Sequence, residues 1–298
     1  MKSNKGSSGS LFLTMKKILL LLGISSICIF AKDDSFIFST EYIEDIPVYV
    51  AYPEKVNKKT RLVLVMHGRQ RNAEEYRDQW GDAAKELNLL VIVPEFSEDA
   101  FPGVFNYNYG RVMNEEGFYS NERPLFSFID PLINYTFNKF KISSSKWGIY
   151  GHGAGAHFVH RYVIYEPNSS HTLAIAANLG WYMTMSEKEW PFGLKNSQIS
   201  NDMLRSSFSK YFLLMLGMND ISTKPNTPYV ASIFKDISEQ GQHRLERGRN
   251  FFNGVLKKSK ELDIFLKWGL VEVPTREGHS NTKQMVPFAA ELFYERLK

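Results

Sequence analysis

Four short segments place polar or very small residues at the end of an apolar run or a few residues after it. They are residues 67–70 (HGRQ), 151–156 (GHGAGA), 217–220 (GMND) and 278–280 (GHS). Two of them supply a carboxylate and an imidazole, Asp220 and His279, the pair of groups that moves protons in acyl-transfer chemistry. Ligands of a parallel sheet bind beyond the carboxyl ends of its strands, so we expect the four segments to form one site.

The segment 151–155 (GHGAG) lies between an apolar run and a helical pattern. A strand, then Gly-x-x-x-Gly, then a helix is the layout of a nucleophile elbow, and its turn is so sharp that a Cβ on either flanking glycine would collide with neighbouring backbone. The elbow is followed along the chain by an acid after a later strand and a histidine after the last one. This order is position 153, Asp220 and His279.

With these elements the sequence resembles the α/β-hydrolase fold, in particular secreted esterase-like members related to polyhydroxyalkanoate depolymerases and feruloyl esterases. The resemblance covers roughly Thr60 to the end of the chain. The segments that carry it are GHGAGAHFVHRY, AANLGWYMT followed by WPFGL, and EVPTREGHSN.

One residue departs from the family pattern, because Gly153 stands where the family has serine. Glycine has no hydroxyl with which to attack a carbonyl carbon. Three explanations are open: an engineered replacement of serine that traps a substrate, a natural pseudoenzyme that binds without turnover, or an enzyme that uses another nucleophile. In the last case, His279 and Asp220 would activate a water molecule.

The resemblance also implies roles for the residues around position 153. His279 would be the general base and Asp220 would fix its tautomer, with Asn219 and Glu246 as rival candidates for the acid. The backbone N–H groups of Arg69 and Ala154 would form the oxyanion hole.

Four further residues are candidates for contact with a substrate, namely His67, His152, Trp181 and Tyr182. For the two histidines, a packing or hydrogen-bonding role is the alternative. The aromatic residues of segment 101–119 could also wall a cleft, or could pack inward as an ordinary loop would. The expected partner is a small acyl or ester compound, and the oligomeric state is left open.

The rest of the chain alternates strands with helices, which predicts an α/β fold with a mainly parallel sheet covered by helices on both faces. We expect a single domain over residues 32–298. The predicted strands are 46–52, 61–66, 89–93, 147–150, 173–177, 211–216 and 265–273, and the predicted helices are 73–87, 124–140, 154–165, 249–262 and 281–297.

The first 31 residues are expected to be a leader with a secretory signal peptide. Met15 and two lysines precede an apolar stretch, residues 18–30, which ends at Ala31. That stretch is shorter than the ~20 residues of an ordinary membrane span. Export to the periplasm or the exterior is therefore expected, with an uncleaved membrane anchor as the alternative. The only cysteine, Cys28, lies in the leader, so the mature chain would hold no thiol.

Charge and composition argue against several other classes of protein. The formal net charge is +4, and the first 31 residues hold four lysines and no acid, so the remainder is neutral and does not resemble a nucleic-acid binder. His157 and His160 lack a carboxylate at metal-binding spacing, so no metal is expected. The glycines of GHGAGA lack the acid of a dinucleotide site, and no cofactor is predicted. Arg244, Arg247 and Arg249 are predicted to lie on a solvated helix face.

Overall fold

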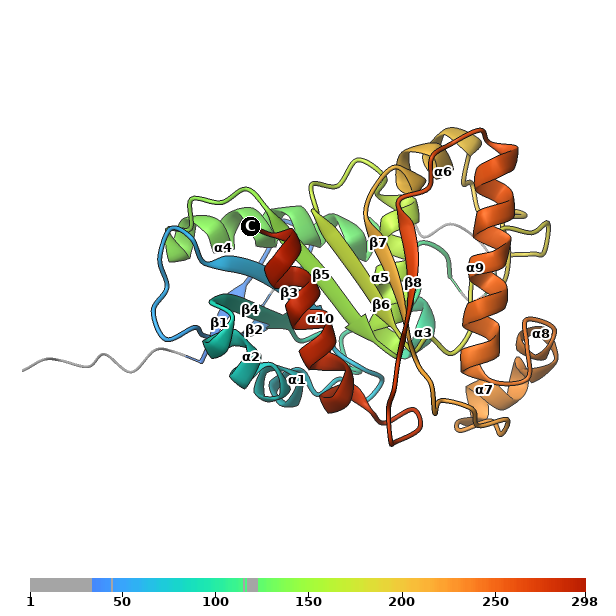
Figure 1. The fold of residues 1–298 in the computed structure, drawn as a ribbon, viewed down its shortest axis with the longest axis horizontal. Helices are drawn as coiled ribbons and strands as arrows, with labels where there is room; N and C mark the ends of the chain where they lie inside the picture. The colour runs from blue at the N-terminus through green and yellow to red at the C-terminus, as the bar shows by residue number, and fades with distance from the viewer. Residues whose placement is uncertain (1–33, 44, 115, 117–122) are drawn as a thin grey trace, which may run out of the picture. The chain divides into compact units, whose positions relative to one another are not determined.

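A sheet of eight strands forms the centre of the computed structural model, which describes residues 34–43, 45–114, 116 and 123–298 (Figure 1). The strand order is β1-β2-β4-β3-β5-β6-β7-β8. β2 runs antiparallel to its neighbours β1 and β4, and the other neighbouring pairs are parallel. The strands are β1 (Ser35–Phe38), β2 (Ile46–Ala51), β3 (Arg61–Met66), β4 (Leu89–Pro94), β5 (Trp147–His152), β6 (Leu173–Ala177), β7 (Phe212–Gly217) and β8 (Trp268–Val273).

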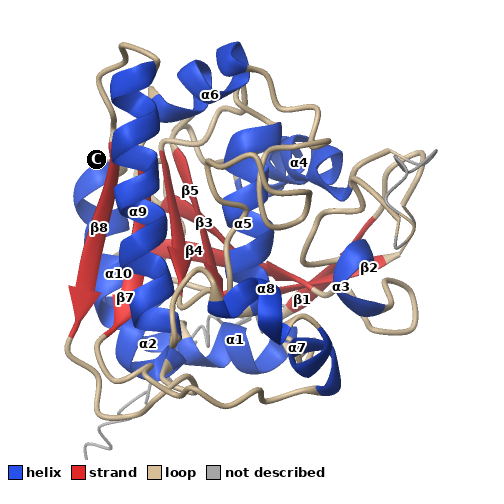
Figure 2. Cartoon of the chain, turned by 90° about the vertical axis from the view of Figure 1, so that its right-hand side faces the viewer, coloured by secondary structure: helices blue, strands red, loops and turns tan. Residues whose placement is uncertain are grey.

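Helices cover both faces of this sheet, which confirms the predicted α/β class. Side chains alternate along a strand, so Leu62 and Leu64 of β3 pack into one core while Val63 and Val65 pack into the other. Helices α1 (Ala73–Gln79), α2 (Gly81–Glu86) and α10 (Thr282–Arg296) cover one face, and α4 (Ile129–Phe140), α5 (Ala154–Tyr165), α6 (Asn201–Phe208) and α9 (Arg244–Glu261) cover the other. Figure 2 shows α9 running alongside β7 and β8.

Several elements differ from the sequence prediction at their ends. The predicted helix 73–87 is two helices that meet at Trp80, whose fully buried ring packs edge-on against Tyr150. The predicted helix 124–140 begins as a 3-10 turn, η1 (Leu125–Phe128). Helix α9 starts at Arg244 rather than at Arg249, because the His243 side chain caps it by accepting a hydrogen bond from the Glu246 N–H.

Short elements were not predicted. These are strand β1, helix α6 and the single-turn helices α3 (Gly103–Asn106), α7 (Pro228–Ser232) and α8 (Phe234–Ser238). One or two turns leave too few residues for a helical period to stand out from a polar loop. The last two helices lie near Tyr109 and Trp181 and pack part of their apolar surface against these rings.

The passage from β5 to α5 brings three backbone segments into close contact. A Cβ on Gly151 would lie 2.2 Å from the Gly155 carbonyl oxygen, and a Cβ on Gly155 would lie 2.0 Å from the Met66 carbonyl oxygen. Both distances are far below van der Waals contact. Between these two glycines, Gly153 turns the chain with φ 57° and ψ −111°. The predicted need for flanking glycines therefore has a steric cause in this fold.

The described residues fall within one compact unit, Asp33–Lys298. The predicted leader and signal peptide, residues 1–31, lie outside the described residues. Among the helices that the structure does describe, none is both long and apolar enough to cross a membrane.

Five of the seven histidines are buried. Burial lowers the pKa of His67, His152 and His171 to about 3 in each case. Burial, with the neighbouring Arg161 guanidinium, also lowers the pKa of His157 and His160 well below its ordinary value. All five imidazoles are therefore neutral in the folded protein at neutral pH, whereas in the unfolded chain each takes up a proton below its ordinary pKa.

The elbow glycines give a first test. Replacing Gly155 by Ala should destabilise the protein by about 3 kcal/mol or more, because the new methyl group meets the Met66 backbone. Gly254 in helix α9 has nothing within 4 Å of its Cβ position, so Gly254→Ala is the matched control and should be neutral or stabilising by up to about 1 kcal/mol. Urea unfolding followed by circular dichroism measures both. Equal midpoints for G155A and the wild type would contradict the steric reading.

The buried histidines predict early acid unfolding. Their folded-state pKa values are depressed, so the stability that they contribute is present above about pH 6.5 and is lost as the pH falls below it. The loss is about 1.4 kcal/mol per histidine per pH unit, or about 7 kcal/mol for all five at pH 5.5, which matches the total stability of a typical domain. We expect cooperative unfolding near pH 5, measured by circular dichroism.

His160 offers the control, because both its ring nitrogens are buried without a hydrogen-bond partner. Replacing His160 by Leu should lower the proton uptake on unfolding by about one. Unchanged proton uptake in H160L would contradict the assignment of His160 as a neutral, buried base.

Candidate active site

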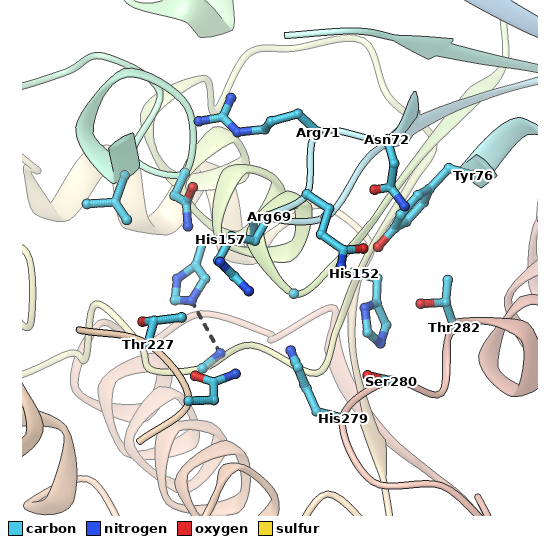
Figure 3. A pocket seen from close by; sticks show the side chains of 18 of the residues that line it. Arg69, Arg71, Asn72, Tyr76, His152, His157, Thr227, His279, Ser280 and Thr282 are labelled. Atoms are coloured by element: carbon cyan, nitrogen blue, oxygen red, sulfur yellow. Dashed lines mark hydrogen bonds between the residues drawn. The ribbon is translucent and has the colours of Figure 1, made fainter. Parts of the chain in front are cut away.

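Loops from six strand ends surround one cavity of about 1100 Å³. They follow β3, β4, β5, β6, β7 and β8, and they bring segments from the whole length of the domain together. In Figure 3 the His152 ring at the end of β5 and the His279 ring in the loop after β8 project towards this space. Residues of all four predicted segments lie at the cavity or in direct contact with a residue that lines it.

The His279 and Asp220 side chains are hydrogen-bonded. His279 Nδ1 lies 2.9 Å from Asp220 Oδ2. An ionised carboxylate only accepts, so Nδ1 carries the proton and the lone pair of Nε2 is left free to take up another. The ring is part-exposed, with 30% of the side chain accessible, while the Asp220 side chain is fully buried. This is the tautomer that a general base requires.

Asp220 remains ionised in spite of its burial. Burial by itself would raise the pKa of this carboxyl, but the hydrogen bond and electrostatic interaction with His279, together with the positive charge of Arg244, outweigh it, and the pKa is lowered. Arg244 Nη1 lies 3.3 Å from Asp220 Oδ1. Of the rival candidates for the acid, Asn219 bonds the Arg276 carbonyl oxygen and Glu246 bonds the Gln242 N–H.

The prediction that the arginines of α9 share a solvated face is wrong for two of the three. The Arg244 side chain is only 8% exposed and pairs with Asp220. Arg247 is also buried, with Nε donating to the Gly180 carbonyl oxygen at 2.7 Å, and burial together with Arg244 lowers its pKa to about 10. Arg249 alone is half-exposed, in a pair with Glu272. The earlier start of α9 turns its first two arginines inward.

Gly153 lies directly beside the free nitrogen of His279. A Cβ built on Gly153 would be 3.4 Å from His279 Nε2 and 3.7 Å from Cε1. A hydroxyl one bond further out would be within hydrogen-bonding reach of that nitrogen. The position therefore has the geometry of a nucleophile, and the residue in it has no side chain.

Two backbone N–H groups in the lining of the cavity, those of Ala154 and Arg69, have no hydrogen-bond partner among the described residues. Ala154 is the first residue of α5, where the helix dipole favours negative charge. Arg69 lies in the loop after β3, and both residues line the cavity. Within the described part of the chain, neither N–H donates a hydrogen bond to another residue. These are the two donors that the sequence predicted.

His67 does not line the cavity, and its predicted contact with a substrate is not supported. Its Nε2 accepts a hydrogen bond from the Phe96 N–H at 3.0 Å, and its Nδ1 donates to the Gly68 carbonyl oxygen at 3.0 Å. The neutral ring, stacked on Tyr107, thus links the loops after β3 and β4. Its place is beneath the Arg69 loop, which it holds in position.

Tyr182 is the second correction. Its ring is fully buried, stacks on Phe251 at 4.5 Å between centroids, and does not line the cavity. The neighbouring Trp181 does line it, and Trp181 Nε1 donates to the Tyr109 hydroxyl at 3.0 Å.

His152 lines the cavity, and two asparagines that the sequence analysis missed hold it. His152 Nε2 lies 3.1 Å from Asn281 Oδ1, which also accepts from Asn178 Nδ2 at 2.7 Å. Asn178 Oδ1 in turn accepts from the Gly217 N–H at 2.7 Å. This network joins the ends of β5, β6 and β7 to the start of α10. A single asparagine after a strand looks like an ordinary turn residue, so no sequence signal distinguished these two.

The aromatic segment proves to be mostly core. Tyr107 and Tyr109 are fully buried, and Phe118 lies outside the described residues. His157 and His160 are buried in α5. In the described ranges, no group of three or more histidine, cysteine or acidic side chains could hold a metal ion.

Comparison with known proteins agrees with this geometry. No protein-family model matches the sequence, and neither does a curated protein. Among solved structures, poly(aspartic acid) hydrolase-1 from Sphingomonas sp. KT-1 is 32% identical, with a TM-score of 0.79 over 87% of this chain and 97% of that one. The poly(3-hydroxybutyrate) depolymerase of Bordetella parapertussis is 27% identical, with a TM-score of 0.74 over 84% of each chain.

More distant structures share the fold alone. An S-formylglutathione hydrolase from Agrobacterium tumefaciens is 15% identical, with a TM-score of 0.58 over 89% of this chain and 95% of that one. Together with the mainly parallel eight-stranded sheet and the order of its loops, these likenesses identify the family. The chain belongs to the α/β-hydrolase fold family, with esterases and depolymerases as its structural neighbours.

Proposed function

We propose that this protein hydrolyses carboxylic esters or related acyl compounds, with a water molecule in the place of the serine hydroxyl. The observation that carries the proposal is the distance of 3.4 Å between His279 Nε2 and the Cβ position of Gly153. The space beside Gly153 is open to the cavity, next to a base of the required tautomer and two free N–H donors.

The reaction then proceeds by addition of water to the carbonyl carbon, followed by expulsion of the leaving group. Water attacks the acyl carbon while His279 Nε2 removes its proton, and the N–H groups of Ala154 and Arg69 bind the oxyanion that forms. The protonated imidazole, held by Asp220, gives its proton to the departing alcohol or amine, and the acyl group leaves as a carboxylic acid. No acyl-enzyme forms, because Gly153 offers no atom to carry it.

The substrate class is proposed from the cavity and the relatives. Two solved structures at 32% and 27% identity belong to proteins named for polymers, poly(aspartic acid) and poly(3-hydroxybutyrate). The cavity of about 1100 Å³ is large enough for several units of such a chain, and Trp181 and Tyr229 give one part of it an aromatic lining. An extended ester or amide chain fits these features.

A second candidate function is binding without turnover. It is favoured by the absence of any side chain at position 153 beside an otherwise complete site.

We also propose that residues 15–31 direct export. N-terminal sequencing of the protein from the cell envelope should begin at Lys32, and a chain that keeps Met15 in the cytoplasm would contradict export.

Four proteins separate the two functions: the wild type, H279Q, G153S and G153S/H279Q. If water is the nucleophile, the wild type hydrolyses p-nitrophenyl acetate or butyrate, and H279Q lowers kcat/KM at least about 10²-fold because the base is lost. G153S should raise kcat/KM by about 10²–10⁴-fold, again only with His279 present. Serine at φ 57° is strained by about 1–3 kcal/mol, so G153S should unfold at lower urea than the wild type.

The dependence of the hydrolysis rate on His279 distinguishes catalysis by the imidazole from residual hydrolysis by the oxyanion hole alone. Residual rates of about 10³–10⁴-fold over water survive in hydrolases from the oxyanion hole alone, and those do not need the imidazole. Equal rates in the wild type and H279Q would end the water mechanism. In that case, a rise in melting temperature with 3-hydroxybutyrate oligomers or poly(aspartic acid), without their consumption, would support the binding function.

A further inference from the structure

The two oxygens of the Asp220 carboxylate have different partners. Oδ2 accepts from His279 at 2.9 Å, and Oδ1 accepts from Arg244 Nη1 at 3.3 Å. The Leu245 N–H also donates to the Asp220 carbonyl oxygen at 3.3 Å. The first turn of α9 therefore holds both the side chain and the backbone of this residue.

The ion pair with Asp220 accounts for the burial of Arg244. Its side chain is 8% exposed, Asp220 is its ion-pair partner among the described residues, and its Nε is buried without a hydrogen bond. A buried guanidinium requires compensation, and here the compensation is the carboxylate that orients the base. The cation also borders the cavity, close to His279.

We propose that Arg244 is a positioning residue that locks the plane of the Asp220 carboxylate. This proposal rests on the proposed function, since it concerns the same site. With Oδ1 held by Arg244, Oδ2 is fixed towards His279 Nδ1.

Other charged or titratable groups face this pair from the surrounding elements. His152 on β5 lies 5.4 Å from His279 between ring centroids and is neutral, because burial lowers its pKa to about 3. Arg247 lies three residues along α9 and interacts with Asp220 only through its charge. The remaining groups are Tyr182 after β6, Glu277 in the loop of His279, Lys283 on α10 and Arg69 after β3.

The test is the proton NMR resonance of the His279 Nδ1–H group in the full chain at fixed pH, with Arg244→Gln compared with Arg247→Gln. H279Q assigns this resonance. R244Q should shift the resonance upfield or broaden it beyond detection, because Oδ2 is no longer held towards Nδ1.

R247Q is the matched control. It removes a buried guanidinium from the same helix without breaking a contact to Asp220, so its effect on the Nδ1–H resonance should be less than half as large. If R244Q leaves the resonance unchanged, or if R247Q moves it as far, the proposal is overturned. The resonance does not depend on turnover, so this failure is distinct from a failure of acyl hydrolysis.

Arg244→Lys guards against misfolding of R244Q and tests positioning. Lysine keeps the charge but offers a compact ammonium in place of the planar guanidinium. The kcat of G153S/R244K should be at least about 5-fold below that of G153S, with KM unchanged. Equal kcat values for G153S and G153S/R244K would overturn the proposal.

Discussion

The site depends on one buried negative charge. Asp220 is inaccessible to solvent, and an isolated carboxylate in that place would protonate rather than stay charged. It stays ionised because His279 and Arg244 each occupy one of its oxygens, and they come from the loop after β8 and from the start of α9. The convergence of these segments on Asp220 fixes the imidazole above the elbow, and the rest of the arrangement follows from it.

None of the contacts that hold this arrangement passes through the side chain of residue 153. His279 is held by Asp220, the oxyanion donors are backbone groups, and the loop before Arg69 is held by His67 and Tyr107. A glycine at the elbow therefore leaves the electrostatics of the site in place. This independence explains how the geometry of a hydrolase and the absence of a hydroxyl coexist in one chain.

Sequence patterns were informative where a steric or periodic rule applies over several residues. The buried strands, the crowded glycines 151 and 155 and the order of Asp220 and His279 all follow from such rules. The patterns failed where the role of a residue depends on the direction of its side chain. Arg244 looks like a surface arginine until the cap at His243 moves the start of the helix, and Tyr182 and Trp181 differ only in which side of the segment they face. Asn178 and Asn281 hold His152 through a network in which their two side chains are hydrogen-bonded to each other.

Position 153 also shows that stability and chemistry make opposite demands. The turn requires φ 57°, which glycine adopts without strain and which serine adopts only at a free-energy penalty. A serine hydrolase keeps serine in this turn despite the backbone strain, because the hydroxyl allows an acyl-enzyme to form. Where direct attack by water or binding alone suffices, no chemical requirement stands against glycine, which adopts this turn without strain. Glycine at this position is thus the residue that the backbone favours once the demand for an acyl-enzyme is removed.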